Sequence, residues 1–373
     1  MPVLTEADWT SLVRWVLAAS FGAAFVFGAI AQRTGFCTMG AVADIYAYGS
    51  WTRMRQWLLA IAVAVAGVGL AQAGGLIDVA DSIYTAPRFT WLGYVLGGAV
   101  FGFGMVLAGG CGVRNLVRLG TGSLKSLVVL IVLGLVAYMT LRGWLAMIRV
   151  QWIETWAWTL PVRQDLPSLL AYLAGWPRES LQWGLALVIA LALLVFVFSD
   201  RHFARFDNLL AGLGLGAVIC AVWLISGWLG RVPEHPQTLE LAFAGSHSGK
   251  MEAMSFVAPV AWSLDWLMFT SDTSRVLSLG VVSVLGVSAG AASMALLTRR
   301  FRWEGFASTE DTAHHLVGAA LMGFGGVTAL GCTIGQGLSG VSTLALGSLL
   351  ALVSILVGAR LGLAYQSWRL ERD

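Results

Sequence analysis

Long apolar stretches dominate this sequence and leave few folds open to it. A helix needs about 20 apolar residues to cross the hydrocarbon core of a membrane. Only helices and closed barrels pair all of their backbone polar groups there, and stretches of this length predict helices. The 373 residues are 58% hydrophobic and 12% charged, whereas a soluble domain is about a quarter charged. We therefore predict an all-α integral membrane protein with a single polytopic domain over 1–373. Nine candidate spans lie near 12–31, 57–76, 92–111, 123–142, 181–198, 208–229, 278–297, 314–332 and 343–364.

Two longer connections differ from these spans. The apolar stretch 251–269 carries Glu252, Pro259 and Asp265, which predicts a re-entrant or interfacial segment. Residues 143–180 are rich in tryptophan and interrupted by prolines. Tryptophan favours the headgroup zone, so we expect this insertion to lie along one membrane face against lipid.

Charge and motifs exclude several classes of function. The net charge of +3 is small and no basic run is present, which argues against nucleic-acid binding. The sequence contains no GxxxxGK[ST] motif, so direct use of ATP is not expected. Nothing in it indicates a cofactor, a metal site or an enzyme.

The distribution of lysine and arginine predicts the orientation of the chain. An amino terminus outside the cell places the larger group of basic residues in the inner loops. We therefore expect a multi-pass protein of a bacterial inner membrane, with its amino terminus outside and its carboxyl terminus in the cytoplasm. The basic residues of the predicted inner loops are Arg33, Arg53, Arg55, Arg114, Arg118, Lys125, Arg201, Arg205, Arg299, Arg300, Arg302, Arg369 and Arg372.

The chain also repeats part of itself. Residues 97–111 read GGAVFGFGMVLAGGC and residues 318–332 read GAALMGFGGVTALGC, with nine of fifteen positions identical at an offset of 221. Small residues that pack membrane helices do not explain why both segments end in Gly-Cys. Five crossings separate the third span from the eighth, so the two copies are predicted to be inverted across the membrane. Inverted repeats are typical of transporters, and we place repeat one at about 12–142 and repeat two at about 181–364.

Both Gly-Cys pairs precede short stretches rich in glycine. Dense glycine weakens a helix but permits close backbone approach, and irregular backbone is tolerated in a bilayer where it lines a cavity or is buried in protein. We therefore predict two broken helices whose tips carry cysteine. Free N–H groups at such tips attract anions. The candidate backbone and side-chain groups at these tips are Gly35, Gly110, Gly112, Gly331, Thr333, Gly335 and Gln336.

Three of the four cysteines are candidate substrate contacts. Cys111 and Cys332 end the repeated segments, and Cys37 lies in a similar Gly-Phe-Cys setting after the first span. Cys220 lies within a span without adjacent glycine and is interpreted as a packing residue. Few charges lie inside the spans, which disfavours a cation relay. A polarizable, sulfur-containing anion fits thiols and amide-lined tips best, because weak S–H donors release a guest as easily as they hold it.

At these residues the chain resembles the YeeE/YedE family of sulfur-transport membrane proteins. The resemblance covers roughly 12–364 and is carried by Gly35-Phe36-Cys37 with Gly40 and Asp44, by 108–111, and by 322–325 leading into 331–337. It implies nine spans with short re-entrant helices, and a thiosulfate-like ion that passes Cys37, Cys111 and Cys332. It also implies a cytoplasmic sulfur-carrier protein as partner.

The sequence leaves alternatives open. Sulfite, a selenium oxyanion or a persulfide fits the same pattern as thiosulfate. Three thiols also suit a transporter of soft metal ions, although no CxxC motif or methionine cluster accompanies them. A membrane thiol oxidoreductase would need two cysteines with Cα atoms within about 7 Å. The direction of transport, its energy coupling and the oligomeric state cannot be read from the residues.

Overall fold

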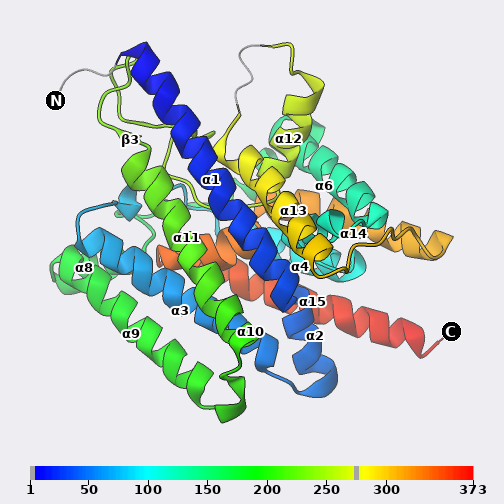
Figure 1. Cartoon of the computed structure of the whole chain (residues 1–373). Helices are drawn as coiled ribbons and strands as arrows, with labels where there is room; N and C mark the ends of the chain where they lie inside the picture. Colours follow the sequence, from blue (N-terminus) through cyan, green and yellow to red (C-terminus); the bar gives the residue numbers. More distant parts are fainter. Residues whose placement is uncertain (1–4, 273–276, 373) are drawn as a thin grey trace.

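Helices make up most of the chain in the computed structural model, which describes residues 5–272 and 277–372 (Figure 1). The α-helices are α1 (Glu6–Thr34), α2 (Thr38–Tyr48), α3 (Thr52–Ala73), α4 (Gly98–Leu107), α5 (Gly112–Gly120), α6 (Leu124–Arg142), α7 (Trp144–Ile148), α8 (Leu166–Ala174), α9 (Arg178–Phe198), α10 (Phe206–Leu209), α11 (Leu215–Leu224), α12 (Ala258–Met268), α13 (Leu279–Leu297), α14 (Thr309–Thr328) and α15 (Leu346–Leu370). The π-helical segments are η2 (Gly93–Gly97), η3 (Arg149–Ile153), η5 (Leu210–Gly214), η6 (Ile225–Leu229) and η7 (Gly335–Gly340), and the 3₁₀ turns are η1 (Val79–Asp81) and η4 (Arg201–Phe203).

Strands are confined to two small antiparallel pairs. Strand β1 (Arg88–Phe89) pairs with β2 (Trp158–Thr159), with Arg88 opposite Thr159. Strand β3 (Arg231–Val232) pairs with β4 (Ala242–Phe243), with Arg231 opposite Phe243. Strand β1 lies in the loop between α3 and η2, β2 lies in the tryptophan-rich connection, and β3 and β4 lie between η6 and α12. All four are two residues long, so the described chain is an all-α protein, as its sequence predicts.

Eight helical segments among the described residues are long and apolar enough to cross a membrane. They cover Glu6–Tyr48, Thr52–Ala73, Gly93–Gly120, Leu124–Arg142, Arg178–Phe198, Phe206–Leu229, Leu279–Leu297 and Leu346–Leu370. The remaining predicted span falls in α14, which has 20 residues but opens with Glu310 and Asp311 in its first turn. The count of nine therefore stays a prediction, whereas the multi-pass helical architecture is confirmed. Helix α12, with 11 residues, is too short to cross a membrane.

Helices α1 and α13 pack with their backbones in direct contact. A Cβ atom added to Gly28 would lie 2.1 Å from the carbonyl oxygen of Val287, and one added to Gly290 would lie 1.9 Å from that of Phe25. Without a hydrophobic driving force between helices in lipid, such close packing of small residues supplies the attraction. These glycines therefore have a packing role, which the sequence shares with many membrane helices.

Helices α4 and α14, which carry the repeated segment, cross each other through glycine. A Cβ on Gly97 would meet the carbonyl of Gly325, and a Cβ on Gly318 would meet that of Gly104. At the offset of 221, Gly97 corresponds to Gly318 and Gly104 to Gly325. The contact of Gly97 with Gly325 is therefore equivalent to the contact of Gly318 with Gly104. The pairing is antiparallel, as a two-fold relation between the copies would require.

The tryptophan-rich connection lies on the outside of the helix bundle. Trp144, Trp152, Trp156, Trp158 and Trp176 are all exposed. Its polar residue Asp165 is instead fully buried, where its carboxylate caps α8 by accepting from the backbone N–H of Ser168 at 3.0 Å. The connection thus joins an apolar exposed surface to a polar anchor inside the bundle, and its contact with lipid stays a prediction.

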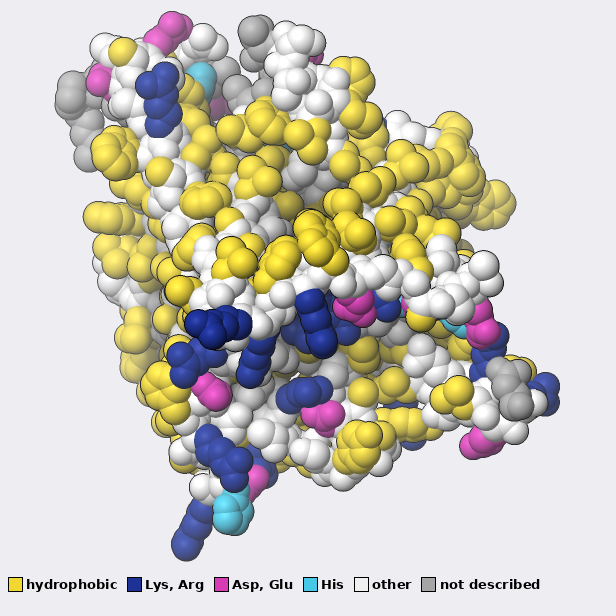
Figure 2. Space-filling model, turned by 45° about the vertical axis from the view of Figure 1, so that its right-hand side comes forward, with side chains coloured by type: hydrophobic (Ala, Val, Ile, Leu, Met, Phe, Trp, Pro, Cys, Tyr) yellow, Lys and Arg dark blue, Asp and Glu magenta, His cyan; other side chains and the backbone are white. Residues whose placement is uncertain are grey.

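Basic side chains gather at one end of the bundle (Figure 2). A wide hydrophobic zone lies above them in the same view. Ion pairs join Arg33 to Asp207 at 3.2 Å and Lys125 to Glu304 at 3.1 Å. Arg33 and Lys125 are among the basic residues of the predicted inner loops.

Candidate functional site

The two repeated segments end in the same hydrogen-bonded turn. After α4, the N–H of Gly109 bonds to Val106 and that of Gly110 to Met105; after α14, the N–H of Leu330 bonds to Val327 and that of Gly331 to Gly326. Each donor and acceptor of one turn lies 221 positions from its counterpart in the other. Gly109 and Leu330, at equivalent positions, both adopt left-handed backbone, with φ of 66° and 58°. The repeat is therefore present in the local backbone conformation as well as in the amino-acid sequence.

Each of the three candidate cysteines lies immediately before a helical turn. The Sγ of Cys37 accepts a hydrogen bond from the N–H of Gly40 at 3.4 Å, at the start of α2. The Sγ of Cys332 accepts one from the N–H of Gly335 at 3.4 Å. Cys111 is the N-cap residue of α5. A thiol in this position replaces the oxygen of a usual N-cap, so each sulfur faces the positive end of a helix.

The fold brings the thiols of distant segments together. The Cys111 thiol lies within electrostatic range of both Cys37 and Cys332, and the Thr333 hydroxyl also faces it. Cys37, Cys111 and Cys332 are 7%, 1% and 1% exposed, so the cluster is enclosed by protein. All are free thiols. The structure therefore gathers the three cysteines that the sequence singles out.

Buried polar atoms without partners surround this cluster. The hydroxyls of Thr38 and Thr333, which directly follow Cys37 and Cys332, have no hydrogen-bond partner, and neither does the Gln336 Oε1. The Trp57 Nε1 and the Tyr84 hydroxyl are in the same condition. Burying such a group without a partner costs about 1–3 kcal/mol, and native proteins keep few of them. So many together indicate a place for a polar guest.

A cavity of about 240 Å³ reaches the Cys332 turn. Its wall includes Tyr84, Glu252, Ser255 and Gly331. Ser255 connects the cavity to the thiol, because its side chain faces the Cys332 sulfur. The cavity therefore gives access to one end of the thiol cluster.

Arginines lie at the other end of the cluster. Arg118 is within electrostatic range of Cys37, Cys111 and Arg114, and its Nη1 donates to the carbonyl of Gly109 at 3.0 Å. The Nη1 of Arg53 approaches Gly40, where an added Cβ would lie 2.7 Å from it. The line of thiols thus runs from a cavity with a carboxyl group to guanidinium groups near Cys37 and Cys111.

Comparison with known proteins decides the family. The sequence profile of the family described as "Sulphur transport" matches residues 33–361, which is most of the chain. The chain belongs to the sulphur transport family. It is 26% identical over 348 residues to the thiosulfate transporter TsuA of Escherichia coli K12, a match that covers 89% of this chain and 90% of that protein. It is also 26% identical over 343 residues to the thiosulfate transporter TsuA of Spirochaeta thermophila, covering 90% of this chain and 94% of that protein.

A third relative matches a shorter region. The probable transporter YedE of Salmonella typhimurium is 34% identical over 98 residues, or 26% of this chain and 21% of that protein. Membership of the sulphur transport family supports a transporter and not an enzyme. It does not favour a soft-metal transporter or a thiol oxidoreductase. Among residues 5–272 and 277–372, no group of three or more His, Cys, Asp and Glu side chains is arranged to hold a metal ion.

The other sequence-predicted residues of this family member lie in the two turns or beside Cys37. Gly35 ends α1 in left-handed backbone with a φ of 67°. Gly112 opens α5, Gly335 donates to the Cys332 sulfur, and the Gln336 amide donates to the carbonyl of Ala329 at 2.6 Å. Gly110 and Gly331 each lie directly before a cysteine. Their roles in binding stay predictions.

Cys220 lies apart from these turns. Its thiol faces the carbonyls of Val63 and Ala64 on α3 at 3.6 and 3.7 Å. A Cβ added to Gly67 would lie 2.3 Å from its sulfur. These contacts are those of a packing residue between two helices.

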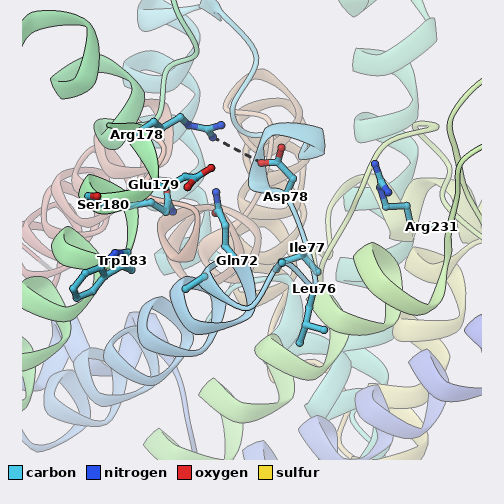
Figure 3. Close-up of a pocket in the computed structure, with 12 residues that line it drawn as sticks. Gln72, Leu76, Ile77, Asp78, Arg178, Glu179, Ser180, Trp183 and Arg231 are labelled. Carbon is cyan, nitrogen blue, oxygen red and sulfur yellow. Dashed lines mark ion pairs between the residues drawn. The ribbon is translucent and has the colours of Figure 1, made fainter. Parts of the chain in front are cut away.

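A second, larger pocket of about 610 Å³ lies between the end of α3 and the start of α9 (Figure 3). Arg178 reaches across it toward Asp78, with nitrogen and oxygen 3.9 Å apart. Gln72, Glu179 and Trp183 also line this pocket, as Figure 3 shows. None of the four cysteines lines this pocket. A choice of site by pocket volume alone would therefore select this pocket and miss the thiols.

Several residues near the thiols escape sequence reasoning. Tyr84, Ser255 and Trp57 come from connections or helix positions without a distinctive motif, and only the fold places them at the cysteines. Glu252 carries a signal in the sequence, namely a carboxyl group in an apolar stretch, which we interpreted only as a break in a span. The pair Arg114 and Arg118 also stands out, because these basic residues follow Cys111 by three and seven positions.

Proposed function

We propose that the protein takes up thiosulfate or a closely related sulfur anion along the line Cys332, Cys111, Cys37. One observation carries the proposal: three free thiols, each at the start of a helical turn, meet in a buried cluster with unpartnered hydroxyls. The names of two full-length relatives, both thiosulfate transporters, support the substrate class. Sulfite, selenium oxyanions and persulfides share enough of this chemistry to serve as competitors in the test below.

The chemistry of the cluster suits an anion that must keep moving. An anion leaving water needs donors, and the helix N-termini and the hydroxyls of Thr38 and Thr333 supply them. Thiols add weak S–H donors that match a polarizable sulfur atom. Because each contact is weak and the next site is near, the anion exchanges one set of donors for another without a deep energy minimum. No ATP is used in this path.

The proposed path lies where the two repeats meet. We place repeat one at about 12–142 and repeat two at about 181–364, inverted relative to each other. The equivalent turns after α4 and α14 and the reciprocal glycine contacts between these helices support this relation. Sites at the interface of inverted repeats are typical of transporters, because rocking of one repeat against the other exposes the site to each side in turn.

Uptake defines the direction of the path. With the amino terminus outside, the cavity lined by Glu252 opens outward and the mouth with Arg53, Arg114 and Arg118 opens to the cytoplasm. An inside-negative potential opposes an incoming dianion by about 2.3 kcal/mol per charge per 100 mV. We therefore propose a cytoplasmic sulfur-carrier protein as partner, because removal of sulfur from the arriving ion keeps its inner concentration low. The arginines at the mouth attract the ion and suit an acidic partner surface.

The test compares single cysteine variants in a bacterial strain that lacks thiosulfate uptake. We expect Cys111→Ala and Cys332→Ala to lower uptake of radiolabelled thiosulfate by at least about tenfold, the effect of about 1.4 kcal/mol on a barrier. Cys37→Ala should also lower it. Cys220→Ala is the matched control, since it removes a thiol outside the cluster, and it should transport like the wild type at equal expression.

Two outcomes would contradict the proposal. One is equal uptake by the wild type and by the Cys111 and Cys332 variants. The other is stronger competition by sulfate, which lacks the terminal sulfur, than by selenium or sulfur analogues. Either result would remove the thiols from the path while leaving the family assignment intact.

A further inference from the structure

A buried carboxyl group lies in the cavity that leads to Cys332. Glu252 is 5% exposed and belongs to the connection before α12, outside the membrane-spanning helices. Its Oε1 accepts a hydrogen bond from the backbone N–H of Ser248 at 2.8 Å. Its own backbone N–H donates to the Ser226 hydroxyl at 3.0 Å. The carboxyl is thus fixed in the wall of the cavity and does not extend into solvent.

Tyr84 lines the same cavity as this carboxyl group and is near the thiol. Its hydroxyl is buried and has no hydrogen-bond partner, and it is within electrostatic range of both Glu252 and Cys332. Ser255 lies on the same cavity wall beside the Cys332 sulfur. An anion that uses this cavity to reach Cys332 therefore passes both Glu252 and the free hydroxyl of Tyr84.

Glu252 forms no ion pair with a lysine or arginine among the described residues. The polar and charged groups that surround it on the neighbouring elements are Tyr84, Ser226, Ser246, His247, Ser248 and Lys250, with Asp81 and its partner Arg231 behind Met251. Burial raises the pKa of the Glu252 carboxyl, and the hydrogen bonds from Ser248 oppose that rise. The protonated form is therefore populated at a higher pH than in an exposed glutamate.

We propose that Glu252 is a proton-operated gate of the anion path. The path admits the anion when the carboxyl group holds a proton taken from the solution on the amino-terminal side. It rejects the anion when the carboxylate is ionised, because two negative charges then share a confined space of low dielectric constant. The proton returns to the same solution when the gate resets, so no bond other than the O–H bond changes. This inference rests on the proposed function for the path that it gates.

Glu252 also has a structural role, and the two roles predict different behaviour. As an anchor, the carboxyl group accepts hydrogen bonds from the turn formed by Ser246, His247 and Ser248, with the Ser248 N–H on Oε1 at 2.8 Å. Glutamine keeps one acceptor oxygen for the Ser248 N–H and has no charge. Replacement by glutamine therefore keeps the bond from the Ser248 N–H and fixes the gate in its neutral state.

The experiment measures uptake of radiolabelled thiosulfate into proteoliposomes of one orientation as the outer pH is varied with the inner pH held constant. Wild-type uptake should fall as the outer pH rises, by up to about tenfold per pH unit above the pKa of the gate. Glu252→Gln should abolish this dependence and transport at high pH as fast as the wild type does at low pH. Glu252→Asp should keep a pH dependence. Tyr84→Phe should slow uptake at every pH without flattening the profile.

Glu179→Gln is the matched control, because it removes a carboxyl group from the other pocket (Figure 3), away from the thiols. It should keep the wild-type profile. A Glu252→Gln protein that keeps the wild-type pH dependence would overturn the gate and leave only the anchor, as would wild-type uptake that does not change with outer pH.

A second measurement separates failure of the gate from failure of the proposed function. Infrared difference spectra between the wild type and Glu252→Gln, recorded against pH without substrate, report the protonated carboxyl of Glu252. A band that persists near neutral pH supports the gate even if the wild type moves no thiosulfate at any pH, a result that would refute only the proposed function. A carboxyl that stays ionised into the acid range overturns the gate even if thiosulfate is transported.

Discussion

At the scale of single residues, the two turns before Cys111 and Cys332 share a backbone conformation but use different residues to adopt it. Both need a left-handed residue two positions before the cysteine. The first turn uses Gly109, which adopts this conformation freely, and the second uses Leu330 at a φ of 58°. A residue with a Cβ atom loses about 1 kcal/mol or more in this conformation. The turn before Cys332 therefore holds strain that its counterpart lacks.

Replacing Leu330 with glycine should release this strain. The Leu330 side chain is 46% exposed, so little packing is lost with it. We expect Leu330→Gly to raise the stability of the purified protein by about 1 kcal/mol, measured by thermal unfolding in detergent. Leu330→Ala is the control, since it removes the side chain and keeps the Cβ atom. A rise of equal size in the alanine variant would show that the side chain, and not the backbone conformation, carries the cost.

The cysteines show how much a residue type and its spacing reveal. Cys111 and Cys332 were singled out by the Gly-Cys repeat and Cys37 by a similar Gly-Phe-Cys setting, and the structure gathers all three. Thr38 and Thr333 gain their importance from a different property, a buried hydroxyl without a partner. Whether a buried hydroxyl finds a hydrogen-bond partner depends on the segments packed against it, so no local sequence pattern predicts this property.

At the scale of elements, the bundle depends on helices that approach more closely than side chains allow. The contact between α1 and α13 is the clearest case, with Gly28, Gly286 and Gly290 facing backbone or alanine of the partner helix. Dispersion and close packing hold such helices together in lipid. A methyl group at these positions has no room unless the helices separate.

Gly290→Ala should therefore disrupt this helix pair. Its Cβ would lie 1.9 Å from the Phe25 carbonyl oxygen, which belongs to rigid backbone. We expect a loss of about 2–3 kcal/mol of stability, seen as earlier aggregation on heating in detergent. Gly22→Ala on α1 is the control, because nothing lies within 4 Å of its added Cβ and stability should not fall. Equal losses in the two variants would mean that glycine is needed in α1 and α13 for a reason other than contact.

Short helices are the elements that sequence predicts least well. The dense glycine after Cys332 predicted a broken helix, and the chain forms the π-helical segment η7 there. The stretch 251–269 was predicted to stop short of a full span, and α12 has 11 residues. The pattern thus shows where regular spans end, whereas the path of the irregular backbone depends on neighbours such as Ser255, which contacts Gly335.

At the scale of the whole molecule, acidic and basic groups lie at opposite ends of the thiol cluster. Glu252 lies in the cavity at one end of the thiol cluster, and Arg53, Arg114 and Arg118 lie at the other. Contacts between Gln237 and Glu6 at 3.0 Å and between the rings of Trp9 and His235 place the connection after β3 beside the start of α1. The carboxyl-bearing cavity therefore belongs to the amino-terminal side of the bundle.

The orientation is tested by accessibility in intact cells. We expect an epitope at the amino terminus to bind antibody on spheroplasts, and one at the carboxyl terminus to bind only after the membrane is permeabilised. The physical reason is that arginine-rich loops resist translocation. Antibody binding at the carboxyl terminus of sealed spheroplasts would reverse the orientation and turn the proposed uptake path into an export path.

The sequence by itself determined that this chain is a helical membrane protein, because apolar length and the lack of charge leave no other way to satisfy its backbone in lipid. It also determined the repeat, the broken segments and the cysteines at their ends. Only the tertiary structure decided which distant groups meet, because Tyr84, Ser255 and Glu252 reach Cys332 through packing of segments that share no local pattern. Periodicity and composition describe how each segment meets its solvent, whereas a site for a guest depends on the polar groups that folding leaves without partners.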